Sequence, residues 1–321
     1  MIYVRKAGVV GAGTMGAAIA EVLALNEIPV VLKDVSPPLV ERGLSKVKSI
    51  VDELVAFHAG RAPKEIARIE DLGVQLTQEQ KKAIENRLKP RFTPAMGEAL
   101  KARVHGTTDY SDFSDVDLVI EAAFERADVK RQVFEDLDKV LPEHAILASN
   151  TSSLSITRLA KGLHHVASTL IAHFFNPPYT LPLVEVVPGV DTREDTVTDV
   201  IEFLQGLRNH RYPLVPIRVK EVPGFLVNRL LIPMLNEACF ALDEGVASAR
   251  DMDQALKAGA GMPMGPLELA DMIGLDVALE VAEILHREYG DPKYRPAVGL
   301  RRLVDAGHYG RKTGRGFYEY T

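Results

Sequence analysis

The most constraining feature of the chain is a glycine-rich segment near its start, Gly11-Ala12-Gly13-Thr14-Met15-Gly16. A short run rich in Val precedes it at residues 4–10, and residues 17–24 have the composition of a helix. Residues 29–34 form a second apolar run that ends on Asp34. A strand, a glycine turn, a helix and a second strand ending on an acid make up the unit that binds dinucleotides. Because all these parts occur in order, the segment predicts a dinucleotide site rather than a chance turn.

Each position of the segment has a physical task in such a site. Gly11 permits the tight turn after the strand, Gly13 lets the backbone approach a pyrophosphate, and Gly16 lets the helix pack on the strand. Thr14 and Met15 open the helix, whose unpaired N–H groups and partial positive charge favour phosphate. We therefore predict Gly11, Gly13, Thr14, Met15 and Gly16 as cofactor-binding residues.

Asp34 decides between the two nicotinamide cofactors. Its carboxylate can accept hydrogen bonds from ribose hydroxyls, whereas a 2′-phosphate would meet a like charge. No Arg follows in residues 35–38 to accommodate such a phosphate. The sequence therefore predicts NAD as the cofactor.

The length of 321 residues and the order of apolar segments predict two domains. Up to residue 220, buried strands alternate with helices, which indicates an α/β Rossmann-type domain with a mostly parallel, doubly wound sheet. A helical-hairpin excursion interrupts it at about residues 39–105, with helical spacing over 39–57 and 77–88 and an irregular tip at 59–63. Residues 221–321 contain no clear strand and predict an all-helical C-terminal domain for substrate binding and dimerisation. Its helices are apolar on more than one face, which is typical of burial against another subunit.

Composition excludes several other classes. The net charge of −6 argues against nucleic acid or an anionic membrane as partner. No apolar run approaches the roughly 20 residues needed to cross a bilayer and no signal peptide is present, so we expect a cytoplasmic protein. The single Cys239 lies in an apolar run, which favours a core thiol over a nucleophile, and it rules out a multi-Cys metal site. We expect no metal.

His173 and Glu185 are the candidate acid–base pair. His173 ends an apolar strand, and Glu185 lies on the next strand twelve positions later. Ligands bind at the carboxyl edge of parallel sheets, where this His should lie. A carboxylate bonded to one imidazole nitrogen fixes the tautomer and raises the basicity of the other nitrogen. Such a pair can equally be structural, and the residues alone leave this open.

Asn150-Thr151-Ser152-Ser153 follows another apolar strand and precedes a helical segment. Asn, Thr and Ser are ordinary helix caps, so spacing alone favours a cap over a catalytic function.

Six sequence blocks favour the catalytic interpretation over the structural one, both for the His173–Glu185 pair and for residues 150–153. Together these blocks resemble the 3-hydroxyacyl-CoA dehydrogenase family. The blocks are residues 149–154 (Ser-Asn-Thr-Ser-Ser-Leu), 173–177 (His-Phe-Phe-Asn-Pro), 183–187 (Leu-Val-Glu-Val-Val), 223–229 (Pro-Gly-Phe-Leu-Val-Asn-Arg), 263–268 (Pro-Met-Gly-Pro-Leu-Glu) and 310–318 (Gly-Arg-Lys-Thr-Gly-Arg-Gly-Phe-Tyr). The resemblance runs from the glycine loop to the last residues and keeps its order.

The resemblance implies NAD-dependent oxidation of the (S)-3-hydroxyl (L-3-hydroxyl) group of an acyl-CoA to the 3-ketoacyl-CoA, as in fatty-acid β-oxidation or butanoate metabolism. It implies His173 as general base, oriented by Glu185, with Ser152 and Asn228 bonded to the reacting oxygen and the base. It also places Glu125, Lys130 and Asn150 in the cofactor site, and it implies a homodimer formed through the C-terminal domain.

The hairpin at residues 39–105 should meet the CoA, but only Ser45, Lys46, Lys48 and Ser49 are candidates, and a solvated helix face explains them as well. Three rivals stay open: a related NAD-dependent dehydrogenase of a free hydroxy or sugar acid, a non-enzymatic dinucleotide-binding protein, and part of a multifunctional fatty-acid oxidation protein. Because the chain starts at its first strand and ends just after residue 318, a freestanding dehydrogenase is the simplest expectation. Retention of both His173 and Glu185 favours an enzyme.

Overall fold

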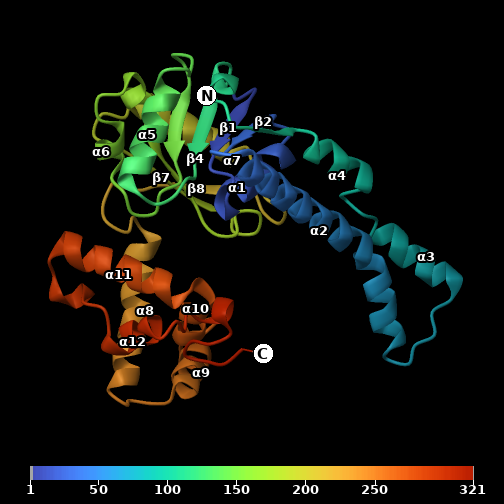
Figure 1. Ribbon diagram of the computed structural model, residues 1–321. Helices are drawn as coiled ribbons and strands as arrows, with labels where there is room; N and C mark the ends of the chain where they lie inside the picture. Colours follow the sequence, from blue (N-terminus) through green and yellow to red (C-terminus); the bar gives the residue numbers. More distant parts are fainter. Residues whose placement is uncertain (1–2, 321) are drawn as a thin grey trace. The chain divides into compact units, whose positions relative to one another are not determined.

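The computed structural model describes residues 3–320, and the chain divides into two compact units between Val219 and Lys220 (Figure 1). The first unit is built on an eight-stranded sheet with the order β3-β2-β1-β4-β5-β6-β7-β8. Its strands are β1 (Ala7–Val10), β2 (Val30–Lys33), β3 (Val104–Thr107), β4 (Leu118–Glu121), β5 (Ile146–Ser149), β6 (Thr169–Phe174), β7 (Leu183–Pro188) and β8 (Val215–Arg218). Strands β1 to β6 are parallel to one another, whereas β7 pairs antiparallel with β6 and β8 is parallel to β7. The predicted mostly parallel sheet with helices is confirmed.

Helices connect these strands and cover both faces of the sheet. The helices of the first unit are α1 (Thr14–Leu25), α2 (Pro37–Glu70), α3 (Gln78–Arg87), α4 (Pro94–Lys101), α5 (Ala127–Asp138), α6 (Ile156–Ala160) and α7 (Glu194–Gln205), with 3-10 turns at Tyr110–Phe113 and His164–Ser168. Helix α6 begins at Ile156 with the Ser155 hydroxyl as its cap, and β6 begins at Thr169.

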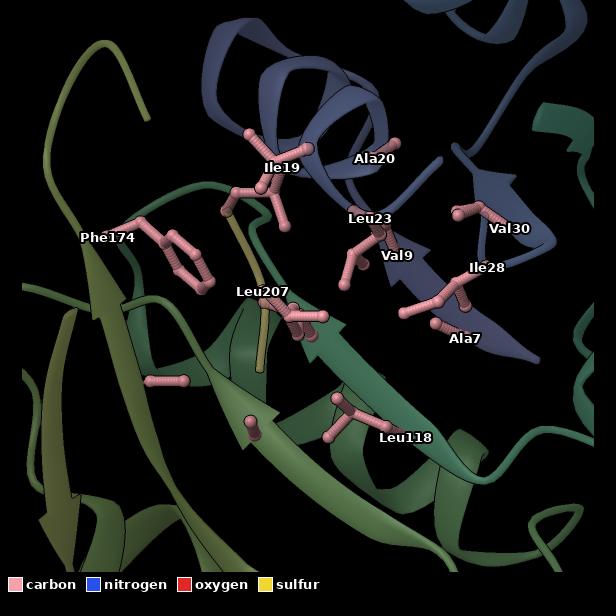
Figure 2. Close-up of a cluster of buried hydrophobic side chains, with 14 of the residues drawn as sticks. Ala7, Val9, Ile19, Ala20, Leu23, Ile28, Val30, Leu118, Phe174 and Leu207 are labelled. Carbon is pink, nitrogen blue, oxygen red and sulfur yellow. The ribbon is translucent and has the colours of Figure 1, made fainter. Parts of the chain in front are cut away.

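One face of the sheet carries a continuous apolar core. Alternate residues of the central strands pack against α1 and α7 there, as period-two strands require. Figure 2 shows Ile19 of α1 and Leu207, just after α7, beside Phe174 at the end of β6. The core therefore reaches the carboxyl edge of β6, next to His173.

The helical excursion differs from the prediction at its tip. The irregular tip expected at residues 59–63 is wrong, because α2 continues through Pro63 to Glu70. Proline lacks the N–H for an i→i−4 bond and bends a helix without always ending it, and Figure 1 shows α2 bending before its end. The excursion ends before β3, which starts at Val104 and pairs with β2 at the sheet edge.

The second unit consists of helices α8 (Val227–Asp243), α9 (Ala249–Ala260), α10 (Pro266–Ile273), α11 (Leu275–Tyr289) and α12 (Val298–Asp305), with 3-10 turns at Pro292–Tyr294 and Arg311–Thr313. Cys239 lies in the apolar core of this unit, where burial raises its pKa to about 12. The predicted core thiol is confirmed. Within residues 3–320, every helix is too short or too polar to cross a bilayer.

Two buried aspartates organise the end of the second unit. The Asp271 carboxylate accepts hydrogen bonds from the backbone N–H groups of Phe317 at 2.9 Å and Tyr318 at 3.0 Å. Asp253 accepts from the N–H groups that open α10 and from the Tyr318 hydroxyl. The sequence blocks at 263–268 and 310–318 are therefore joined to each other through these two carboxylates.

Candidate active site

The glycine loop lies between β1 and α1, and its backbone admits no side chain at two positions. Gly11 has φ +101°, and a Cβ there would lie 2.5 Å from the Ala122 carbonyl oxygen. A Cβ on Gly16 would lie 1.7 Å from the carbonyl oxygen of Gly11. Both glycines are thus required by the turn and by the approach of α1 to the sheet.

Gly13 has a different environment, because a Cβ there would meet no atom within 4 Å. It is the cap residue of α1 and supplies no side-chain acceptor, so nothing of that kind covers the helix start at Thr14 and Met15. The first-turn N–H groups of α1 are therefore not covered by a side-chain cap, and the space beside Gly13 is open. Both properties fit the binding of a pyrophosphate.

Asp34 directly follows β2 and points back to the loop. Its Oδ2 accepts a hydrogen bond from the Ala12 backbone N–H at 2.8 Å, and its Oδ1 accepts one from Val35 at 2.7 Å. Each carboxylate oxygen can accept two hydrogen bonds, so acceptor capacity remains for ribose hydroxyls. The residues of this structure therefore fit NAD.

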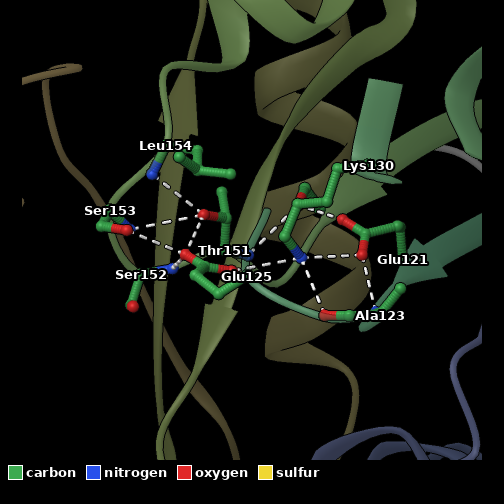
Figure 3. A network of polar contacts seen from close by, with 9 residues as sticks. Glu121, Ala123, Glu125, Lys130, Thr151, Ser152, Ser153 and Leu154 are labelled. Atoms are coloured by element: carbon green, nitrogen blue, oxygen red, sulfur yellow. Dashed lines mark hydrogen bonds and ion pairs between the residues drawn. The ribbon is translucent and has the colours of Figure 1, made fainter. Parts of the chain in front are cut away.

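A polar network joins the ends of β4 and β5 (Figure 3). The Glu125 Oε1 accepts hydrogen bonds from the Thr151 hydroxyl, the Ser152 N–H at 3.1 Å and the Ser153 hydroxyl at 3.0 Å. Its Oε2 lies 3.3 Å from the ammonium of Lys130, which is almost fully buried. Burial opposes ionisation of Glu125, but Lys130 and the two hydroxyl donors together lower its pKa.

Glu121, the last residue of β4, completes this network and was not predicted as a site residue. Its Oε1 lies 2.7 Å from the Lys130 ammonium, and its Oε2 accepts from the Ser149 hydroxyl at 2.6 Å. Burial raises the pKa of Glu121 even though Lys130 opposes it. The only sign of Glu121 as a site residue in the sequence is that a charged residue ends an apolar strand.

The turn after β5 is fixed by side chains rather than by a helix. The Thr151 hydroxyl accepts from the N–H groups of Ser153 and Leu154. Figure 3 shows the Ser152 side chain pointing away from Glu125 and Lys130. Since Ser155 is the residue that caps α6, Ser152 is not the helix cap that spacing alone favoured.

Asn150 connects this turn to the next strand. Its side-chain oxygen accepts a hydrogen bond from the Phe174 backbone N–H at 2.8 Å. The residue assigned to the cofactor site from sequence thus also holds the end of β6, one residue after His173.

His173 and Glu185 are directly opposite each other in the antiparallel register of β6 and β7. The His173 Nδ1 lies 2.7 Å from the Glu185 Oε2, and the two residues are 6% and 1% exposed. The Phe175 ring lies against the imidazole, with centroids 4.7 Å apart. A carboxylate on Nδ1 makes that nitrogen the N–H donor and leaves the lone pair of neutral imidazole on Nε2.

Asn228 belongs to the second unit, in the first turn of α8. The chain enters this helix through Gly224 and Phe225, which both have positive φ. The neighbouring Arg229 guanidinium lies over the rings of Tyr289 and Tyr294, at 4.4 and 4.6 Å from their centroids. These contacts fix the first turn of α8 and with it the backbone of Asn228.

The hairpin candidates lie on exposed positions of α2. Ser45, Lys48 and Ser49 line a groove together with Asp52 and Glu53. Lys46 is exposed and is not among the residues that line this groove.

A parallel sheet with a glycine loop and an acid after β2, beside a His–Glu pair at the sheet edge, defines the class of NAD-binding oxidoreductases. The comparisons with known proteins give the family. The model described as 3-hydroxyacyl-CoA dehydrogenase, NAD binding domain, matches residues 6–75 and 67–222, and the model of the C-terminal domain matches 224–320. The chain belongs to the 3-hydroxyacyl-CoA dehydrogenase family. The predicted family, oxidoreductase class and NAD cofactor are confirmed.

Full-length relatives agree with this result. A 3-hydroxybutyryl-CoA dehydrogenase of Bradyrhizobium diazoefficiens is 40% identical over 99% of this chain and 96% of its own length. The mitochondrial hydroxyacyl-coenzyme A dehydrogenase of Homo sapiens is 37% identical over 99% of this chain and 92% of its own. The crystal structure of (S)-3-hydroxybutyryl-CoA dehydrogenase from Ralstonia eutropha matches with a TM-score of 0.81 and 40% identity, over 99% of this chain and all of that one.

Proposed function

We propose that this dehydrogenase oxidises the (S)-3-hydroxyl group of 3-hydroxyacyl-CoA and that His173 is its general base. The observation that carries this assignment is the contact of 2.7 Å between His173 Nδ1 and Glu185 Oε2 on two paired strands. Because Glu185 occupies Nδ1, the proton of the substrate hydroxyl passes to Nε2. The Glu185 carboxylate then stabilises the imidazolium that forms.

Oxidation removes two hydrogens from the substrate in different forms. The hydroxyl loses its proton to His173, the C3–H bond breaks with its electron pair, and a C3 carbonyl forms. NAD, when bound, supplies the acceptor for that hydride. Reduction of the 3-ketoacyl-CoA runs through the same groups, with the His173 imidazolium returning the proton.

Ser152 and Asn228 are proposed as donors to the reacting oxygen and partners of the base. The fixed turn around Ser152, with its side chain directed away from Glu125, supports this assignment. Donors that are positioned in advance stabilise developing negative charge on oxygen without reorganisation.

Nine residues are proposed to hold the cofactor. The glycine loop would bind the pyrophosphate and Asp34 the adenosine ribose, while the network at the ends of β4 and β5 would face the nicotinamide half. These residues are Gly11, Gly13, Thr14, Met15, Gly16, Asp34, Glu125, Lys130 and Asn150.

The assay that tests the function follows NADH oxidation with acetoacetyl-CoA and with free acetoacetate. We expect turnover with the thioester and at most traces with the free acid. Turnover of free acetoacetate without turnover of acetoacetyl-CoA would instead support a dehydrogenase of free hydroxy acids. Rates across 3-ketoacyl-CoA chain lengths would then measure the acyl-chain preference, and the KM for acetoacetyl-CoA of variants at Ser45, Lys46, Lys48 and Ser49 would test whether these residues bear on CoA binding.

The setting of the enzyme is also a proposal. We expect a cytoplasmic homodimer, assembled through the helical C-terminal domain, that acts in fatty-acid β-oxidation or butanoate metabolism without nucleic acid or membrane as partner. Light scattering of the full chain and of residues 1–219 alone measures whether the second unit carries the dimer contact.

A further inference from the structure

We infer that Glu21 and His210 are positioning residues for the reaction, because they hold the connection between the two strands that carry His173 and Glu185. This inference rests on the proposed function of that pair. It concerns residues 175–182, which join β6 to β7 within the first unit.

Glu21 is a carboxylate in an otherwise apolar part of α1. It is fully buried, and its Oε1 lies 2.9 Å from the His210 Nε2. Its Oε2 is buried as well and has no hydrogen-bond partner among the described residues. A buried carboxylate with one unsatisfied oxygen costs stability, and an apolar residue at this place would be cheaper. A contribution to stability therefore does not explain why a carboxylate occupies position 21.

His210 extends this contact to the β6–β7 connection. Its backbone N–H donates to the Tyr179 carbonyl oxygen at 3.1 Å, and its imidazole lies against the Tyr179 ring with centroids 5.3 Å apart. The neighbouring Asn209 donates its amide to the Pro178 carbonyl oxygen at 3.2 Å. The His210 side chain is only 12% exposed, so the Glu21 contact is shielded from water.

The position of residues 175–182 matters because the catalytic pair lies at both ends of this connection. His173 is one residue from the end of β6, and Glu185 is the third residue of β7. Asn150 fixes the start of the connection through the Phe174 N–H at 2.8 Å, whereas His210 fixes its middle at Tyr179. A shift of about 1 Å in catalytic geometry can cost on the order of 10²-fold in rate.

The test compares three variants of the full chain with wild type. H210L leaves Glu21 without its partner, H210Q keeps a donor toward Glu21, and the double variant E21M/H210L replaces the pair with apolar side chains. For each we measure kcat with acetoacetyl-CoA, the NADH dissociation constant by fluorescence, and Tm. H165L is the matched control, because His165 is buried even more deeply than His210 and contacts Asp138 at 2.7 Å at the other end of β6.

We expect H210L and the double variant to lose about tenfold in kcat with NADH affinity within twofold of wild type. The Tm of the double variant should equal or exceed that of H210L, because buried pairs are often replaced by apolar residues without loss. H210Q should recover at least half of the wild-type kcat, and H165L should lower Tm but not kcat.

A double variant with wild-type kcat would overturn the inference, and so would an H210Q variant as slow as H210L. Should H210L fail to fold, the double variant and H210Q still decide the question. H173Q is measured in parallel: if it stays active, the proposed function fails, whereas an inactive H173Q with a fully active double variant refutes only the positioning of the connection.

Discussion

The Asp34 carboxylate holds the glycine loop, because its Oδ2 accepts the Ala12 backbone N–H at 2.8 Å. The acid predicted to meet the ribose therefore also joins the end of β2 to the turn after β1. Selectivity for the cofactor and the shape of its binding loop depend on the same side chain, and substitutions of Asp34 have to be chosen to separate the two effects.

Asp34→Asn should separate them. The amide keeps an oxygen acceptor for Ala12 but removes the charge that repels a 2′-phosphate. We expect the ratio of kcat/KM for NADP over NAD to rise at least about tenfold, which corresponds to about 1.4 kcal/mol. Steady-state kinetics with both cofactors measure the ratio.

The matched variant is Asp34→Ser, whose shorter side chain takes away the carboxylate acceptors and should lower Tm as well. If Asp34→Asn rejects NADP as strongly as wild type, another residue sets the preference.

His173→Gln should lower kcat by about 10²- to 10⁴-fold, because positioned general-base catalysis is lost while a side chain of similar polarity remains. NADH binding should stay within twofold of wild type, since the glycine loop and Asp34 are unchanged. Stopped-flow NADH oxidation and fluorescence titration measure the two quantities. An equal loss of both would indicate that His173 is structural.

Glu125→Gln should change how stability depends on pH. Lys130 and the donors from Thr151 and Ser153 outweigh burial and hold the Glu125 pKa below the ordinary value of 4.5. The ionised group therefore stabilises the fold above about pH 4.5, and this contribution disappears as the pH falls through the folded-state pKa.

The Tm difference between wild type and Glu125→Gln should consequently be largest near neutral pH and shrink below pH 4.5. Glu135→Gln is the control, because Glu135 is also partly exposed and pairs with Arg131 in the same helix. Parallel Tm curves for wild type and Glu125→Gln across this range would contradict the assignment.

Gly316→Ala should destabilise the second unit. A Cβ at this position would lie 2.0 Å from the Asp271 Oδ1, which accepts the Phe317 N–H. Overpacking of this kind costs about 1–3 kcal/mol. Gly259→Ala is the control, because a Cβ there meets nothing within 4 Å and lies inside α9. Thermal unfolding of both variants measures the difference, and equal Tm values would refute the clash.

The elements that could be predicted from the sequence are those whose requirements lie in one contiguous segment. The strand, glycine loop, helix and acid around Gly11 and Asp34 were predictable because one short segment carries every requirement. The edge strand β3 was not, because only Val104 of its four residues is buried and its pairing with β2 spans a long excursion. The continuation of α2 through Pro63 was missed because proline usually marks an end.

Some residues of the candidate site could be predicted from the sequence and others could not, for similar reasons. His173 and Glu185 stand on strands with clear apolar patterns, and the resemblance assigned them their roles. Glu121 was missed because its partners Lys130 and Ser149 meet it only in the folded sheet. The antiparallel direction of β7 has no signal in its own residues, although it is what places Glu185 opposite His173.

That reversal of β7 has a genetic consequence. Two parallel neighbours need a crossover of about a dozen residues or more, which would separate a base from its orienting carboxylate by a helix and its loops. Here a short connection suffices, and the pair lies within the segment from His173 to Glu185. Fewer than fifteen codons encode both groups, so a recombination breakpoint elsewhere in the gene transfers the two together or leaves both behind.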